Sequence, residues 1–253
     1  MALIHCEFYS HALGRKTSAY VILPEHRDIK DKKQRLKTLY LFHGLGDNYT
    51  KWIRRSSIEK CAAADDWAVV MPDAQKSYYS NTVDGERYWD YIGEELPYLV
   101  QKNFPLLSDR REDRFAAGLS MGGYGAMKMA LNYPDRFCAA ASFSGALDLE
   151  REMQEEAVLG KALFGSAENI RGTENDLFYL IRKLRDEGKE IPGIYLSCGT
   201  EDPIYPQSQT FRQVLDELEV PCTYEEWPGK HDWVFWEECI KHALPWFLKK
   251  DGV

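Results

Sequence analysis

The segment Gly118-Leu119-Ser120-Met121-Gly122 has the residue types for nucleophilic chemistry, because a serine stands between two glycines. A serine in a GxSxG pattern becomes an exposed nucleophile when it lies on a sharp turn from a strand into a helix. Both elements are predicted here: Arg114–Ala117 is a buried strand, and Met121–Tyr133 is a helix that ends before Pro134. Glycines suit the turn because larger side chains would collide there. Ser120 is therefore the candidate nucleophile.

A second segment, His43-Gly44-Leu45-Gly46, directly follows the predicted strand Thr38–Phe42. A nucleophilic serine that attacks an acyl group needs two backbone N–H donors for the developing oxyanion. In this arrangement one donor follows the nucleophile and the other comes from the loop after the third strand. We expect these to be the amides of Met121 and Leu45, which form an oxyanion hole. His43 itself is expected to be a buried structural histidine.

A serine hydroxyl is a weak nucleophile near neutral pH, so a base is required. Of the six histidines, His231 is the candidate, because it lies in the turn Pro228–Trp233 just before the last predicted helix. The others fall in the first strand region, in a charged loop, after the third strand or inside the last helix: His5, His11, His26, His43 and His242.

The base needs a carboxylate to orient it. Asp202 and Glu201 both follow the predicted strand Ile194–Cys198, and functional groups gather at the carboxyl ends of parallel strands. The shorter acid beside Pro203 favours Asp202, although the residue pattern alone leaves Glu201 open. The chain order Ser120, Asp202, His231 is that of an α/β-hydrolase.

Short apolar runs alternate with helical patterns along the chain. The predicted strands are Ala19–Leu23, Thr38–Phe42, Trp67–Met71, Arg114–Ala117, Cys138–Phe143 and Ile194–Cys198. The predicted helices are Ile53–Ala64, Glu94–Phe104, Met121–Tyr133, Leu177–Glu187, Gln207–Leu218 and a last one from Trp233, which Pro245 should kink or restart. Because such alternation requires crossover connections, we predict a mostly parallel central sheet with helices on both faces.

Three further features complete the predicted α/β-hydrolase fold. The N-terminal strands, joined by the charged run Glu25–Lys37, are expected to form an antiparallel edge. No linker or repeat divides the chain, so residues 1–253 are predicted to be a single domain. The polar, acidic stretch 148–176 is predicted to be a small helical insertion, and the sequence leaves open whether it covers the site as a lid.

The composition narrows the partners of the protein. The 253 residues carry a net charge of −8, which disfavours nucleic acid and anionic membranes, since both need a basic patch. No window of 18 apolar residues and no secretion signal are seen, and the six cysteines are scattered without metal-site spacing, so we expect a cytoplasmic protein with reduced thiols. A small-molecule ester is the expected partner, and a homo-oligomer remains open.

Four segments resemble the esterase D-like branch of the α/β-hydrolases, and within it the bacterial tributyrin esterases. They are GLSMGGYGAMKMA (Gly118–Ala130), SFSGA (Ser142–Ala146), GTED (Gly199–Asp202) and HDWVFW (His231–Trp236). The resemblance spans nearly the whole chain. It implies a carboxylesterase for short acyl chains that uses no metal or organic cofactor, and it favours Asp202 over Glu201 as the acid.

The same branch includes S-formylglutathione hydrolases, feruloyl and acetyl-xylan esterases, and mycolyl transferases. S-formylglutathione hydrolases have a longer loop with Thr and Cys after the oxyanion segment, where this chain has Gly46-Asp47-Asn48. Thioester hydrolysis and the hydrolysis of feruloyl or acetyl esters of plant oligosaccharides therefore stand as alternatives to short-chain ester hydrolysis.

Aromatic residues cluster in loops that follow the predicted strands, where they could form the wall of an acyl or alcohol pocket. We expect Trp52 and Trp233 to bind substrate, because they neighbour the oxyanion segment and the base. Tyr79 and Trp89, from the aromatic loop after the fourth strand, are further candidates.

Overall fold

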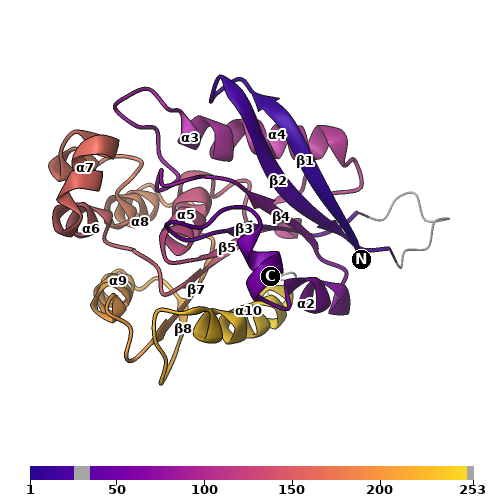
Figure 1. Cartoon of the computed structure of the whole chain (residues 1–253). Helices are drawn as coiled ribbons and strands as arrows, with labels where there is room; N and C mark the ends of the chain where they lie inside the picture. Colours follow the sequence, from indigo (N-terminus) through magenta and orange to yellow (C-terminus); the bar gives the residue numbers. More distant parts are fainter. Residues whose placement is uncertain (26–34, 250–253) are drawn as a thin grey trace.

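The computed structural model describes residues 1–25 and 35–249, and their backbone is organised around a twisted sheet (Figure 1). Within these residues the sheet has eight strands in the order β1-β2-β4-β3-β5-β6-β7-β8. The strands are β1 (Ala2–Ser10), β2 (Arg15–Leu23), β3 (Thr38–Phe42), β4 (Ala68–Pro72), β5 (Arg114–Leu119), β6 (Ala139–Phe143), β7 (Gly193–Gly199) and β8 (Cys222–Trp227). From β4 to β8 every neighbouring pair is parallel, which confirms the predicted mostly parallel sheet.

Helices cover both faces of the sheet, as the alternating pattern predicts (Figure 1). They are α1 (Lys51–Arg55), α2 (Ile58–Ala64), α3 (Tyr88–Asp90), α4 (Leu96–Asn103), α5 (Met121–Asn132), α6 (Leu149–Glu155), α7 (Ala157–Phe164), α8 (Leu177–Asp186), α9 (Tyr205–Glu217) and α10 (Trp233–Leu248). A π-helical turn, Tyr91–Glu95, precedes α4, and 3-10 turns span Arg111–Asp113 and Ala167–Ile170.

The two faces of the sheet bury separate hydrophobic clusters. Alternate residues of β3 point to opposite sides: Leu39 and Leu41 pack with α1, α2 and α10, whereas Tyr40 and Phe42 pack with α4, α5, α8 and α9. A strand buried on both sides needs apolar residues at every position, and this requirement is why β3 is recognisable in the sequence as a continuous apolar run.

The N-terminal edge is antiparallel, but its strands differ from the predicted pair. β1 pairs with β2 through the turn at residues 11–14, and β2 pairs antiparallel with β4. The expectation that the charged run Glu25–Lys37 joins two paired strands is wrong, because β4 lies between β2 and β3. Residues 26–34 of that run lie outside the described residues.

Two helix predictions need correction. The predicted helix Ile53–Ala64 is divided into α1 and α2, because the Ser56 hydroxyl donates to the Trp52 carbonyl (2.6 Å) and Ser57 turns to bind Glu237 of α10. α10 continues through Pro245 to Leu248, so of the predicted kink or restart at this proline, the restart does not occur.

The stretch 148–176 contains α6, α7 and a 3-10 turn, in agreement with the predicted helical insertion. Figure 1 shows α6 and α7 beside α8, on the opposite side of the molecule from the N-terminus. Glu152 of α6 accepts hydrogen bonds from the Tyr78 hydroxyl (3.2 Å) and the Gln207 amide (2.7 Å), so the insertion is tied to two neighbouring segments. Across residues 1–25 and 35–249, no helix is long and apolar enough to span a membrane.

Candidate active site

Ser120 lies on the sharp turn between β5 and α5, where the sequence places it. Its backbone has φ 53° and ψ −121°, a region that residues other than glycine rarely adopt. The Ser120 amide donates to the Phe143 carbonyl of β6 (2.9 Å), and the Ser120 carbonyl accepts from the amides of Gly123 (2.9 Å) and Tyr124 (3.1 Å). These bonds hold the strained residue in place beyond the end of β5, where Ser120 is half-buried and its hydroxyl meets His231.

Two glycines make this turn sterically feasible. A Cβ atom on Gly118 would lie 2.3 Å from the Gly122 carbonyl oxygen, and one on Gly122 would lie 2.4 Å from the Phe42 carbonyl oxygen. Both contacts involve backbone atoms, which cannot move aside without disturbing β3 or α5. The GxSxG pattern is therefore a packing requirement of the turn.

Three side chains that are distant in the sequence meet at the carboxyl edge of the sheet. The Nε2 atom of His231 lies 3.0 Å from the Ser120 Oγ atom, and its Nδ1 atom lies 2.9 Å and 3.1 Å from the two carboxylate oxygens of Asp202. Ser120 follows β5, Asp202 follows β7, and His231 precedes α10. Glu201 is exposed and contributes only its backbone amide, which donates to the Gly229 carbonyl (3.0 Å). Of the two acids that the residue pattern left open, Asp202 is the one in contact with His231.

The charge on Asp202 determines the direction of the hydrogen bonds that His231 makes. Burial by itself raises the pKa of the Asp202 carboxyl, but hydrogen bonds from His231 and from the Ile204 amide (2.9 Å) outweigh burial and lower that pKa. Ionised Asp202 accepts a hydrogen bond from the Nδ1–H group of His231, which leaves Nε2 as the acceptor for the Ser120 hydroxyl. The His231 side chain is 28% exposed, so substrate can reach the imidazole.

The segment after β3 forms a turn directly beside the serine. A Cβ atom on Gly44 would lie 2.6 Å from the Leu119 side chain and 3.5 Å from Ser120 Cβ, so the turn packs closely against the nucleophile. Among the described residues, no acceptor takes a hydrogen bond from the Leu45 amide or the Met121 amide. Two backbone donors beside Ser120 are thus available to an oxygen atom of a ligand.

His43 stabilises the turn that follows β3. It is 1% exposed, its Nε2 atom accepts from the Ala74 amide (2.9 Å), and its Nδ1 atom lies 2.9 Å from the Gly44 carbonyl oxygen. Because Nε2 is an acceptor, Nδ1 carries the proton and donates to Gly44. The imidazole therefore links the loop after β4 to the turn after β3, which is the structural role that the sequence predicts.

Of the four aromatic residues predicted to form the pocket, three are buried and one is half-buried. Trp52 is 1% exposed and donates from Nε1 to the Phe42 carbonyl (2.9 Å), while its ring meets Trp233 edge to face. Tyr79 and Trp89 are buried as well, which argues against their forming the wall of an open pocket. Only Trp233 of the four predicted side chains is half-buried beside the base.

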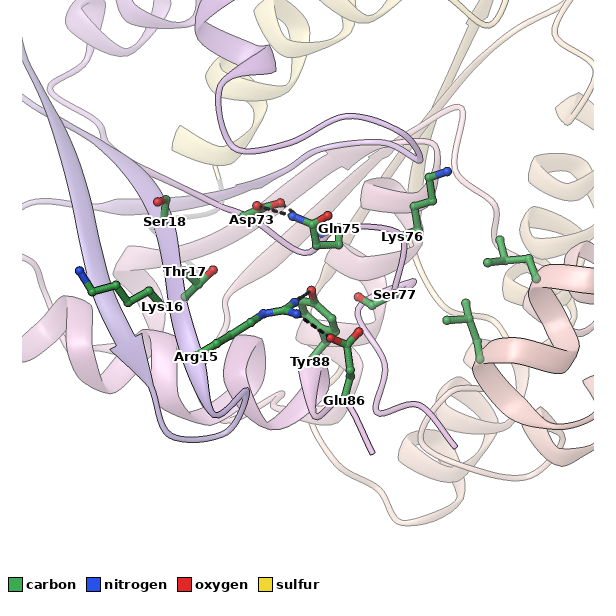
Figure 2. Close-up of a pocket in the computed structure, with 12 residues that line it drawn as sticks. Arg15, Lys16, Thr17, Ser18, Asp73, Gln75, Lys76, Ser77, Glu86 and Tyr88 are labelled. Atoms are coloured by element: carbon green, nitrogen blue, oxygen red, sulfur yellow. Dashed lines mark hydrogen bonds and ion pairs between the residues drawn. The ribbon is translucent and has the colours of Figure 1, made fainter. Parts of the chain in front are cut away.

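A polar cavity of about 560 Å³ lies between the start of β2, the loop after β4 and α7 (Figure 2). In Figure 2 the Arg15 side chain extends across its floor to Glu86 (2.8 Å) and Tyr88. Ser120, Asp202 and His231 do not line this cavity. Its wall includes Asp73, whose carboxylate is 3.6 Å from Nε2 of His43. The His43 side chain therefore lies between this wall and the turn after β3.

Sequence reasoning missed one residue close to this machinery. Lys128 lies on α5, two turns after the nucleophile, and is 0% exposed. Its signal in the sequence is a charged residue within the otherwise apolar helix GYGAMKMAL. In the part of the chain that the structure describes, no group of three or more His, Cys, Asp and Glu side chains could hold a metal ion.

Comparisons with known proteins agree with this geometry. A family model described as "Putative esterase" matches residues 10–247. The chain is 32% identical to the acetyl esterase of Caldicellulosiruptor saccharolyticus, over 98% of this chain and 99% of that protein. It also resembles the substrate-bound fluorophosphonate-binding serine hydrolase F of Staphylococcus aureus (36% identity, TM-score 0.92, 98% of each chain). S-formylglutathione hydrolase from the same organism is similar too (35% identity, TM-score 0.88, 98% of each chain).

Proposed function

Because this chain belongs to the esterase family and is a carboxylic ester hydrolase, we propose that it cleaves short-chain acyl esters, of acetyl to butyryl type, through an acyl-enzyme. The observation that carries the proposal is the set of hydrogen bonds that joins Ser120 to His231 and His231 to Asp202, with two available backbone amides beside Ser120. This arrangement supplies a nucleophile, a base, an orienting acid and an oxyanion hole.

In the acylation step, Nε2 of His231 takes the proton of the Ser120 hydroxyl while Oγ attacks the ester carbonyl carbon. The carbonyl oxygen becomes an oxyanion, which accepts hydrogen bonds from the Leu45 and Met121 amides. The tetrahedral intermediate collapses, the bond to the alcohol oxygen breaks, and His231 returns its proton to the leaving alcohol. Ser120 is left as an ester of the acyl group.

In the deacylation step, His231 takes a proton from water, and the resulting hydroxide attacks the acyl carbon. The same two amides hold the second oxyanion. When this intermediate collapses, the bond between Ser120 Oγ and the acyl carbon breaks, His231 returns its proton to Oγ, and the acid is released. Asp202 stays ionised in both steps, because its hydrogen bonds lower the pKa of the carboxyl. Its charge stabilises the imidazolium that forms each time.

Two observations support a small acyl group. The relative that is 32% identical is named an acetyl esterase. Beside the oxyanion turn, Trp52 and Trp233 meet at 5.1 Å between ring centroids, and their bulk narrows the space that an acyl chain could enter. We assign Trp233 to the acyl wall and Trp52 to its support, because Trp52 is fully buried.

Thioester hydrolysis is a second candidate, because a structure that is 35% identical is titled S-formylglutathione hydrolase. Both reactions use the same nucleophile, base and oxyanion donors, so the triad does not distinguish between them. They differ in the leaving group, which is a thiol in one case and an alcohol in the other.

A hydrolysis panel with the purified protein tests the proposal. The substrates are p-nitrophenyl acetate, butyrate and octanoate, methyl ferulate, acetylated xylo-oligosaccharide and S-formylglutathione, with Ser120→Ala as the inactive reference. We expect the highest kcat/KM for acetate or butyrate and at least about 10⁴-fold lower kcat for Ser120→Ala. A strong preference for the thioester or for ferulate would replace the proposed substrate class. Near-normal turnover by Ser120→Ala would reject the nucleophile.

A further inference from the structure

The ammonium group of Lys128 is enclosed behind the nucleophile by three oxygen atoms. Its Nζ atom donates to the Tyr79 carbonyl (2.9 Å), to the Ser80 hydroxyl (3.0 Å) and to the Asn175 side-chain oxygen (2.6 Å). The same atom lies 4.1 Å from the centre of the Trp89 ring. Within residues 1–25 and 35–249, no carboxylate forms an ion pair with it. All three hydrogen-bond acceptors of this buried cation are therefore neutral groups.

This environment matches the charged form of the lysine. An ammonium group has three N–H donors, and three oxygen acceptors surround Nζ. A neutral amine would direct its lone pair at one of these oxygens, and the face of Trp89 also favours a positive charge. The charge is nevertheless costly to bury, so the three acceptors must be kept in place as long as the group is protonated.

On one side, Lys128 holds a strained turn in the loop after β4. Tyr78 and Tyr79 have φ values of 49° and 51°, in the left-handed region that side-chain-bearing residues avoid. Lys128 binds the Tyr79 carbonyl, and the Ser80 hydroxyl, itself bound to Lys128, donates to the Tyr78 carbonyl (2.9 Å). The ammonium therefore contacts this turn twice and offsets its backbone strain.

The strained turn is in contact with the oxyanion turn. The Tyr79 hydroxyl donates to the His43 carbonyl (2.9 Å), one residue before Gly44. The Tyr79 ring packs on α5 at Gly125, where a Cβ atom would lie 2.5 Å from the ring. Because the ring cannot move toward α5, a shift of the Tyr79 backbone would displace the hydroxyl, the His43 carbonyl that it binds and the following turn with the Leu45 amide.

On the other side, Lys128 belongs to a row of side chains spaced by four residues along α5. The Tyr124 hydroxyl donates to the Asn175 carbonyl (2.8 Å), and the Asn132 amide donates to the Glu174 carbonyl (3.0 Å). Residues at this spacing share one face of a helix. The row fixes the end of the 148–176 insertion. The Tyr124 ring also faces Tyr78 of the strained turn (6.2 Å between ring centroids), and Lys128 is the member that donates to both the Tyr79 carbonyl and the Ser80 hydroxyl.

We propose that Lys128 is a positioning residue for ester hydrolysis, whose ammonium holds the Tyr78–Ser80 turn so that Tyr79 keeps the Leu45 amide directed at the oxyanion. The inference rests on the proposed function, because it assumes that the Leu45 amide is an oxyanion donor. Lys128 does not touch the substrate. It acts through Tyr79 and His43.

The charge on Lys128 gives this role a pH dependence. Burial lowers the pKa of Lys128 to about 7, and the attraction of Glu174 and Asp90 opposes the effect of burial. These two acids come from the end of the insertion and from α3, and the buried phenols of Tyr79 and Tyr124 remain neutral because burial raises the pKa of each well above its usual value. Since the protonated form holds the turn, activity should fall as the pH rises through the Lys128 pKa.

The first test compares Lys128→Met with Tyr124→Phe, using p-nitrophenyl acetate at pH 7. Methionine keeps most of the volume of the lysine but removes all three hydrogen bonds, and Tyr124→Phe removes one buried hydrogen bond from the same helix face. Loss of an oxyanion donor costs about 10²–10³ in kcat, so misplacement of one donor should cost about 10–100-fold, with KM changed by less than about threefold. Tyr124→Phe should stay within about twofold. Wild-type kcat in Lys128→Met overturns the proposal.

A second variant covers the case in which Lys128→Met fails to fold. Tyr79→Phe removes only the hydroxyl that binds the His43 carbonyl, and it should also lower kcat with KM unchanged. Where Lys128→Met does fold, a lysine that acts through Tyr79 makes the double variant no slower than the slower single variant. Losses in kcat that multiply in the double variant overturn the proposal, as does wild-type kcat in Tyr79→Phe.

The pH profile separates positioning from simple stabilisation. Wild-type kcat should decline between about pH 7 and 9 as Lys128 loses its proton, and this decline should be absent from Lys128→Met. A decline that persists in the variant, or its absence from the wild type, overturns the role of the charge. If the wild type does not hydrolyse the ester, or Ser120→Ala is equally active, the proposed function fails instead.

Discussion

Replacement of Asp202 by asparagine tests the assignment of the acid most directly. The carboxylate has two oxygens near Nδ1 of His231, at 2.9 Å and 3.1 Å, and the more distant oxygen also accepts from the Ile204 amide (2.9 Å). In Asp202→Asn the side-chain oxygen would remain with the Ile204 amide, so the NH2 group would face His231. An NH2 group cannot accept a hydrogen bond from Nδ1–H, so the imidazole would adopt the other tautomer, with its proton on Nε2.

That tautomer donates to the Ser120 hydroxyl instead of accepting its proton, and no negative charge remains to stabilise the imidazolium. In a serine protease triad the equivalent change lowers kcat by about 10⁴, and the same mechanism gives about 5 kcal/mol of lost transition-state stabilisation here. Because asparagine has nearly the shape of aspartate, KM for p-nitrophenyl acetate should change little.

The assay is steady-state hydrolysis of p-nitrophenyl acetate by Asp202→Asn, with Glu201→Gln as the matched control. Glu201 is the neighbouring acid, it is exposed, and its side chain has no contact with His231, so its variant should keep wild-type kcat within about twofold. The reasoning is refuted if Asp202→Asn keeps more than a tenth of wild-type kcat. An equal loss in Glu201→Gln would move the acid by one residue.

Three further predictions concern the turn, the pH dependence of stability and the absence of a cofactor. Gly122→Ala would place a methyl group 2.4 Å from the Phe42 carbonyl oxygen, and the clash should lower the free energy of unfolding by about 3 kcal/mol. Urea unfolding measures this loss, and a change below about 0.5 kcal/mol would contradict the packing argument. The pKa of Asp202 is lowered in the folded protein, so its ionised form adds stability above the unfolded pKa of about 3.9, and this contribution is lost as the pH falls through the folded pKa. The difference in unfolding free energy between wild type and Asp202→Asn should therefore be largest above about pH 5 and should shrink toward pH 3, and a constant difference would count against the ionised state. Dialysis against EDTA should leave p-nitrophenyl acetate hydrolysis unchanged, because protein groups perform each step, whereas a loss restored by a divalent cation would require a metal in the mechanism.

Local sequence was sufficient for the features that depend on near neighbours in the chain. The elbow around Ser120 is predictable because a sharp strand-to-helix turn excludes side chains at two positions, and glycine is the residue that meets this condition. The central strands are predictable because burial on both faces requires continuous apolar runs. β8 was missed for the same reason: it lies at the edge of the sheet, is largely half-exposed and includes Glu225 and Glu226, so it has no such run.

Tertiary structure decided the features that depend on distant contacts. Asp202 and Glu201 are adjacent in the sequence, and only the path of the loop after β7 brings one of them to His231. The sequence placed Tyr79 and Trp89 in a loop, where aromatic side chains are commonly exposed. Both are buried, because Tyr79 packs on α5 at Gly125 and Trp89 lies against Lys128 and Tyr133. The sequence did not predict Lys128 as a positioning residue. Its three acceptors come from segments up to 49 residues away and surround the ammonium group only when the chain is folded.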